Sequence, residues 1–168
     1  MKKEKNSNEF YYCASYPIWV IGIRWLFFLL FFALSTYIAF LVKEQFAYLY
    51  VIYGAICLSL ILPLSKCVNC YYYAKRCQCG WGKVAGYLFK RGTEEKFNHS
   101  FKFILLLYPL WIIPLILGFI QLLRKRTLFE LILFLALLLI LLLERFSKRK
   151  LGCRICFMRK DCPEVNPE

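Results

Sequence analysis

Four long apolar runs constrain this chain more than any other feature of its sequence. They cover residues 18–42, 46–64, 103–123 and 128–143. Crossing the hydrocarbon of a bilayer takes about 20 apolar residues, with a range of roughly 17–25. The first three runs fit that range, and the fourth, with 16 residues, can span only if Phe129 and Glu130 lie near the interface. The sequence therefore predicts an all-α integral membrane protein with four transmembrane helices.

The basic residues divide unequally between the two sides of such a bundle. The side that holds the N-terminus, the central loop and the tail carries 18 of the 23 Lys and Arg. The other side carries Lys43 and the cluster Arg124–Arg126, which is a counter-signal. The positive-inside rule predicts a cell-membrane protein with both termini in the cytoplasm. This distribution accounts for most of the net charge of +13 without a nucleic-acid partner, and no nucleic-acid-binding motif is present.

The predicted organisation alternates spans with cytoplasmic segments. In order, these are a cytoplasmic N-terminal segment, transmembrane hairpin 1, a cytoplasmic Cys-rich loop with an interfacial segment, transmembrane hairpin 2 and a cytoplasmic Cys-rich tail, at residues 1–17, 18–64, 65–102, 103–143 and 144–168. The interfacial segment is 80–90, where basic and apolar residues alternate.

Arg24 is the only charge well inside the first run. It lies about 9 Å along the helix from Ile18, so we expect its long side chain to snorkel toward the cytoplasmic interface. We expect no other ionisable group to be buried between the spans. The spans therefore lack the ionisable side chains that a proton relay needs, which argues against an ion-coupled transporter.

The two predicted hairpins resemble each other in sequence. Tyr16-Pro-Ile-Trp19 opens the first, and Tyr108-Pro-Leu-Trp111 lies early in the second. A CxxC follows each hairpin, at 67–70 and at 153–156, and an aromatic residue comes directly after each CxxC. The pattern indicates a tandem duplication of a two-helix hairpin with an axis along the membrane normal, which would place the two cytoplasmic Cys-rich lobes side by side.

Eight of the nine cysteines fall on the predicted cytoplasmic side. They are Cys13, Cys67, Cys70, Cys77, Cys79, Cys153, Cys156 and Cys162, whereas Cys57 lies in the second span as a small core residue. Disulfides are rare in a reducing compartment, so clustered cysteines there indicate metal ligands or catalytic thiols. CxxC spacing lets two thiolates reach one ion, and two such pairs complete a tetrahedral shell for zinc. CxxC with a further Cys, and Pro163 after the last one, also shares features with ferredoxin-type ligation of an iron–sulfur cluster.

Two geometries of the metal site follow from this pattern. In the first, which the duplication favours, Cys67, Cys70, Cys153 and Cys156 converge on one ion. In the second, each lobe builds its own site. Cys77 or Cys79 would then complete the first site, and Cys162 with Cys13 the second.

The sequence points to a class of chemistry and to no substrate. The leading hypothesis is a membrane-embedded metal-thiolate protein that acts as an iron–sulfur electron carrier at the cytoplasmic face, with the lipid bilayer and a cytosolic or membrane redox partner around it. The alternatives are a non-enzymatic scaffold or assembly subunit with structural zinc sites and, third, a thiol-disulfide oxidoreductase. His99 is the only histidine and is expected to be an exposed loop residue, so no hydrolytic machinery can be assembled.

Overall fold

Helices dominate the structure, a computed structural model that describes residues 3–5, 11–93 and 102–159. The helices are α1 (Ile18–Val42), α2 (Glu44–Ile56), α3 (Trp81–Leu88), α5 (Tyr108–Lys125) and α6 (Leu128–Ser147). π-Helical turns extend α2 at Cys57–Ile61 and Pro63–Cys67 and extend α6 at Lys148–Gly152. 3₁₀ turns occur at Lys102–Leu107, Cys153–Ile155 and Phe157–Arg159. Two short strands, β1 (Lys3–Lys5) and β2 (Tyr11–Cys13), pair antiparallel.

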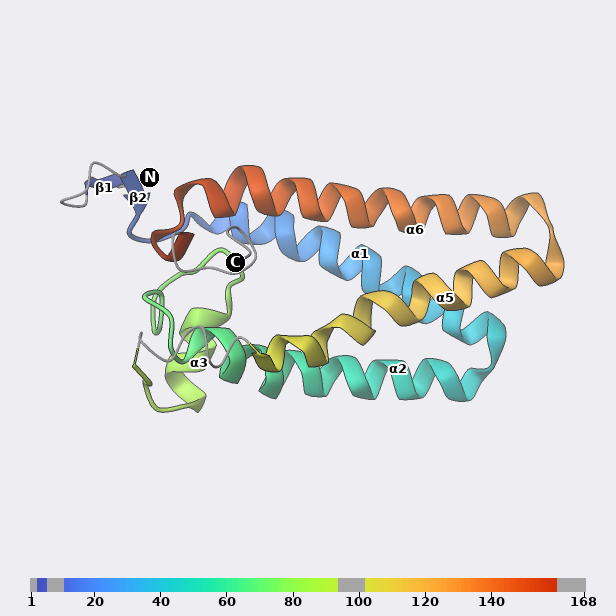
Figure 1. Cartoon of the computed structure of the whole chain (residues 1–168), viewed down its shortest axis with the longest axis horizontal. Coiled ribbons are helices and arrows are strands. Elements are labelled where there is room, and N and C mark those ends of the chain that lie inside the picture. The colour runs from blue at the N-terminus through green and yellow to red at the C-terminus, as the bar shows by residue number, and fades with distance from the viewer. Residues whose placement is uncertain (1–2, 6–10, 94–101, 160–168) are drawn as a thin grey trace.

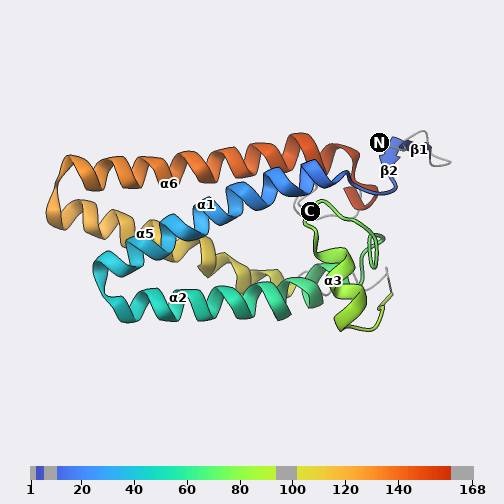
Figure 2. The same cartoon turned by 180° about the vertical axis from the view of Figure 1, so that it is seen from behind.

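The long helices form two antiparallel hairpins that lie side by side (Figure 1). The first consists of α1 and α2 and the second of α5 and α6, and α1 contacts each of the other three. The two tight turns, at Lys43 and at Arg126–Thr127, lie at one end of the bundle. The N-terminus, α3 and the C-terminal segment share the opposite end, as the view from behind also shows (Figure 2).

Three helical segments are long and apolar enough to cross a membrane. They are Ile18–Val42, Glu44–Cys67 and Phe103–Lys125. The first coincides with its predicted run, and the other two extend past theirs by no more than three residues at an end. α6 begins where predicted but continues to Ser147, and its 20 residues include Glu130, Glu144 and Arg145. These helices extend beyond the apolar runs because backbone hydrogen bonding continues through polar residues at a helix end.

The bundle exposes large apolar side chains around most of its circumference. Leu105 and Leu128 are more than two-thirds exposed, and most outward positions of the long helices are apolar too. The interior is small by comparison: Phe31, Ile38 and Leu137 form its centre, and the rings of Phe31 and Trp111 lie 4.6 Å apart. Exposed apolar area on this scale needs a non-aqueous environment or a partner to cover it.

Each hairpin turns within one or two residues. Arg126 adopts a left-handed conformation with φ of 50°, and Thr127 caps α6 by accepting a hydrogen bond from the backbone N–H of Glu130 at 3.3 Å. The Glu130 carboxylate is 6% exposed and pairs with the Lys125 ammonium at 3.2 Å. The turn thus places Glu130 at the end of the bundle in an ion pair. The expectation that no further ionisable group is buried between the helices was wrong at this position and, as described below, at Glu144.

Candidate metal and thiol site at the cysteine-bearing end

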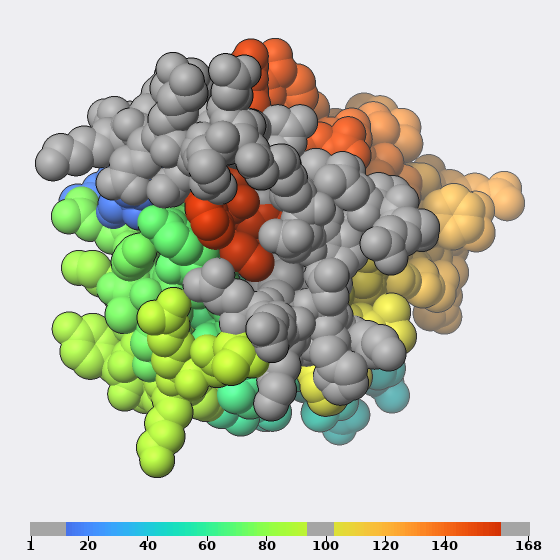
Figure 3. Space-filling model, turned by 60° about the vertical axis from the view of Figure 1, so that its left-hand side comes forward, coloured from blue at the N-terminus to red at the C-terminus, as the bar shows by residue number. Residues whose placement is uncertain are grey.

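Three segments distant in sequence meet at the end of the bundle opposite the tight turns. We refer to their described residues, 11–17, 66–93 and 148–159, as the cysteine cap. The space-filling view toward this end shows the green loop and the red C-terminal segment next to each other (Figure 3). The buried centre of the cap is formed by Cys13, Tyr16, Tyr72 and Cys77, together with Val20 of α1.

Two buried tyrosines connect the three segments. The Tyr16 hydroxyl donates to the carbonyl of Gly152 at 2.8 Å. The Tyr72 hydroxyl donates to the carbonyl of Cys13 at 2.7 Å and accepts from the backbone N–H of Phe157 at 3.1 Å. Burial raises the pKa of both phenols well above the usual value, so each stays protonated and able to donate. Tyr72 therefore joins the N-terminal segment, the loop and the tail through one hydroxyl.

The aromatic residues that follow the two CxxC motifs lie against each other. The rings of Tyr71 and Phe157 are 4.1 Å apart and nearly parallel. Tyr72 meets the other side of Tyr71 edge-on at 5.2 Å. The Lys75 ammonium lies 3.9 Å from the centre of the Tyr71 ring, in cation–π contact. These rings bring the loop and the tail together next to the cysteines.

Cys77 and Cys79 form the best-defined thiol pair of the cap. The Cys77 sulfur accepts the backbone N–H of Gly82 at 3.2 Å, and its thiol hydrogen-bonds to Cys79. That hydrogen bond, followed by the positive charges of Arg24, Lys66 and Lys148, holds the pKa of Cys79 below its usual value. Donating the same hydrogen bond, together with burial, raises the pKa of Cys77. Of the two thiols, Cys79 therefore loses its proton more readily.

The remaining two cysteines of the loop lie next to this pair. Cys67 ends the extension of α2, is 7% exposed and lies close enough to Cys70 and Cys79 for their charges to interact. Cys70 packs against the buried centre of the cap. All four cysteines of the first lobe are thus neighbours on one connected segment.

Arg24 of α1 reaches the thiolate from inside the first span. Its Nη1 donates to the Cys79 sulfur at 3.6 Å, and its Nη2 pairs with the Glu144 carboxylate of α6 at 3.4 Å. The side chains of Arg24 and Glu144 are only 11% and 15% exposed. Arg24 does extend toward the cysteine-bearing end, as predicted, but its charge is compensated by protein groups instead of water.

The turn around Cys79 is fitted to α1. Gly80 has φ of +81°, which favours glycine, and a side chain there would come within 3.0 Å of Ile21 and Trp25. The Trp25 indole N–H donates to the Cys79 carbonyl at 3.2 Å. The main chain next to the thiolate is therefore held by the first two turns of α1.

Cys13 and Cys156 of the second lobe also lie near Tyr16 and Tyr72. Cys13 is fully buried and donates to the carbonyl of Ser15 at 3.0 Å. Cys156 lies close enough to both tyrosines for its charge to interact with them, and β2 contacts the turn that begins at Cys153. Cys57 is buried within the bundle, as predicted. Cys162 and His99 lie outside the described residues.

Cysteines of both lobes pack around one buried cluster: Cys13 and Cys77 belong to it, and Cys70, Cys79 and Cys156 lie against it. Within the described ranges, no three Cys, His, Asp or Glu side chains are close enough together to hold a metal ion as they stand. The cross-lobe set Cys67, Cys70, Cys153 and Cys156 is therefore not assembled. The lobe-by-lobe sets are not assembled within the described residues either, so the choice between the two geometries stays a prediction.

Sequence reasoning missed three residues that shape the site. Glu144 could have been found, because Arg24 lies near the start of α1 and Glu144 near the end of α6, so packing of these helices places both at one depth. Tyr72 gave no usable signal, because it is one of three consecutive tyrosines. Gly82 is needed because a side chain there would meet the carbonyl oxygens of Tyr72 and Lys75 at 2.4 and 2.5 Å.

No protein-family model, no curated protein and no solved structure matches this chain.

Proposed function

We propose that this chain is an integral membrane protein whose cysteine cap binds a metal ion or cluster through thiolates. The observation that carries the proposal is the Cys77–Cys79 pair, in which the hydrogen bond from Cys77 and the Arg24 guanidinium, 3.6 Å from the Cys79 sulfur, lower the pKa of Cys79. Metals bind cysteine as the thiolate, so a thiol with a lowered pKa reduces the cost of binding.

The fourth span of this proposal is α6. Its 20 residues measure about 30 Å, the thickness of the hydrocarbon core. Glu130 and Glu144 lie near its two ends, each in an ion pair, and the 13 residues between them are all apolar. α6 packs against both α1 and α5, beside α1 at the cap end and beside α5 toward the other end (Figure 1). With 18 of the 23 basic residues in the N-terminal, central-loop and tail segments of the sequence, the positive-inside rule favours cytoplasmic termini.

The proposal includes a tandem duplication of the hairpin. The stacking of Tyr71 on Phe157 supports it, because these residues hold equivalent positions after the two CxxC motifs. The two copies of the other repeated motif, Tyr-Pro-x-Trp, lie in different environments: Tyr16 is buried, whereas Tyr108 is half exposed. A duplicated framework with different packing of its copies accounts for both observations.

We assign the first metal site to Cys67, Cys70, Cys77 and Cys79, all within one loop. Rotation of their side chains is required, since the sulfurs do not yet converge. Two features of the surroundings suit a thiolate cluster. The Gly82 N–H donates to the Cys77 sulfur, and Arg24, Lys66 and Lys148 supply positive charge around Cys79. The second site would use Cys13, Cys153 and Cys156 with Cys162.

The metal decides between two roles. An iron–sulfur cluster would make the chain an electron carrier at the cytoplasmic face, with a cytosolic or membrane redox partner. A zinc ion would instead hold the cap together and make the chain a scaffold or assembly subunit. Both metals accept four cysteine thiolates, so the donor set alone does not choose between them.

A thiol-disulfide function is the second candidate, favoured by the Cys77–Cys79 hydrogen bond. A low-pKa thiolate beside a second thiol is the arrangement that attacks a disulfide and then resolves the mixed disulfide. Cys79 would attack a partner disulfide and Cys77 would close the new one. Two electrons and two protons would pass to the partner, which leaves as two thiols.

Metal analysis of the purified full chain tests these alternatives. After anaerobic purification in mild detergent, we expect either stoichiometric zinc or iron with acid-labile sulfide. Cys79→Ser should lose the metal of the first site, whereas Cys57→Ser, a matched change inside the bundle, should keep it. Protein without either metal, in which Cys77 and Cys79 cycle between thiols and a disulfide, would contradict metal binding and favour the thiol-disulfide function.

A further inference from the structure

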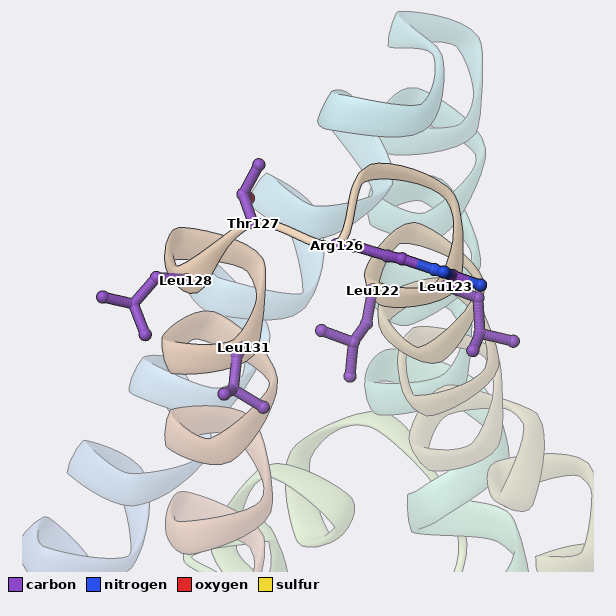
Figure 4. Close-up of a pocket in the computed structure, with 6 residues that line it drawn as sticks. All are labelled: Leu122, Leu123, Arg126, Thr127, Leu128 and Leu131. Carbon is purple, nitrogen blue, oxygen red and sulfur yellow. The ribbon is translucent and has the colours of Figure 1, made fainter.

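The end of the bundle opposite the cap carries a cleft that the proposed function does not use. It lies between the end of α5 and the start of α6, has a volume of about 410 Å³ and is lined by Leu122, Leu123, Arg126, Thr127, Leu128 and Leu131. Figure 4 shows the Leu122 side chain extending toward α6, while the Arg126 side chain extends away from that space, over the end of α5 beside Leu123. The rest of the lining is mostly hydrocarbon.

The charges at this turn are unequally compensated. Lys125 pairs with the buried carboxylate of Glu130 at 3.2 Å. Arg124 and Arg126 are exposed on either side of it. Arg126 is the only charged residue among those that line the cleft. An arginine beside an apolar cleft is suited to a ligand that has an anionic group and a hydrocarbon chain, because guanidinium binds phosphate oxygens in pairs.

We infer that this cleft binds one molecule of an anionic phospholipid, with its phosphate on Arg126 and an acyl chain against Leu122 and Leu131. The position of the turn supports this occupant. α5 ends at Lys125 and α6 begins at Leu128, so a bundle that spans the bilayer places the turn at headgroup depth. The site also gives Arg126, one of the basic residues that depart from the positive-inside pattern, a phosphate partner. The inference rests on the proposed membrane insertion of the bundle and is independent of the cysteines.

Lipid retention by the purified full chain tests the site. The protein is equilibrated in detergent with equal amounts of phosphatidylglycerol and phosphatidylcholine, repurified, and its bound lipid measured by native mass spectrometry. We expect the wild type to retain phosphatidylglycerol in preference. Arg126→Gln should weaken this binding by about ten-fold or more, the loss expected for one charge-assisted hydrogen bond. Excess inorganic phosphate should not displace the lipid, because it makes no contact with the leucines.

Two further variants keep the test decisive. Arg149→Gln removes an exposed arginine at the opposite end of the bundle and should leave retention unchanged. Arg126→Gly removes the guanidinium but suits the left-handed backbone, so it should lose the lipid without loss of fold. Equal losses in the Arg126 and Arg149 variants, or normal retention by Arg126→Gly, would overturn the site. Release of the wild type from membranes by alkaline carbonate would instead overturn membrane insertion, whatever the metal content.

Discussion

Removing the carboxylate from the pair between Arg24 and Glu144 should strongly destabilise the bundle. The atoms are 3.4 Å apart, and both side chains are at least 85% buried. In Glu144→Gln, the guanidinium keeps only its contact with Cys79 while staying in a low-dielectric environment. Breaking a buried pair on one side typically costs about 3–5 kcal/mol. Because the Cys79 thiolate still compensates part of the charge, we expect the lower end of that range, about 3 kcal/mol.

A double-mutant cycle separates this pair from a general loss of packing. Arg24→Met should also destabilise, because it leaves Glu144 unpaired. Combining Arg24→Met with Glu144→Gln should cost less than the two single changes together, with a coupling free energy of about 1–3 kcal/mol. Glu130→Gln is the matched control. It leaves Lys125 without its partner, but the Lys125 side chain is 46% exposed and can be solvated, so the cost should be smaller.

Equilibrium unfolding in mixed detergent micelles, followed by tryptophan fluorescence, gives the free energies for this cycle. For a chain of this size, about 3 kcal/mol corresponds to a fall of roughly 6–12 °C in Tm. Two outcomes would refute the reasoning. One is a free energy of unfolding for Glu144→Gln within about 0.5 kcal/mol of the wild-type value, which is the usual range for surface changes. The other is strict additivity of the Arg24 and Glu144 variants.

Four further predictions concern the cap. In reduced, metal-free protein, Cys79 should react with a small alkylating reagent below the usual thiol pKa, and Arg24→Gln should move its pH–rate profile to higher pH; an unmoved profile would contradict the role of the guanidinium. Since the depressed pKa makes the thiolate stabilising at high pH, that contribution should be lost as the pH falls through the lowered pKa. Tyr72→Phe removes two buried hydrogen bonds and should cost about 2 kcal/mol in thermal unfolding, so wild-type stability would argue against its linking role. Gly82→Ala should cost more than about 2 kcal/mol because backbone carbonyls block its Cβ, whereas Gly22→Ala, with open space around it, should be nearly neutral in the same assay.

The helical framework could be predicted because its signal is strong and local. An apolar run such as 18–42 has one stable solution in a bilayer, a continuous helix, and the structure forms that helix with the same bounds. The end of α6 was less predictable. Its apolar run stops at Leu143, while the helix continues through Glu144 to Ser147, because Glu144 finds a partner on α1 that no local pattern reveals.

The site was predictable in its residue types but less so in its geometry. Cysteine spacing indicated that thiols would gather at one end, and the cap does bring Cys67, Cys77 and Cys79 together. Spacing alone favoured convergence across the lobes, because equivalent residues of a repeat were expected at equivalent depths. In the structure Tyr71 and Phe157 stack between the loop and the tail, and Cys70 and Cys156 pack against the same buried cluster without converging on one site.

The contact between Arg24 and Cys79 makes the cap and the bundle electrostatically dependent on each other. One guanidinium compensates two anions, the thiolate of the cap and the carboxylate of α6. If a metal ion or a disulfide neutralises the negative charge of the Cys79 sulfur, Glu144 is the remaining anion in contact with the Arg24 guanidinium. The Arg24–Glu144 pair then becomes stronger. The packing of α1 against α6 therefore depends on the chemical state of Cys79, whichever thiol chemistry the cap performs. Measuring the Arg24–Glu144 coupling energy with Cys79 intact and in Cys79→Ser tests this dependence: the coupling should be larger when the sulfur is absent, and equal values would show that the thiolate and the carboxylate do not share the arginine.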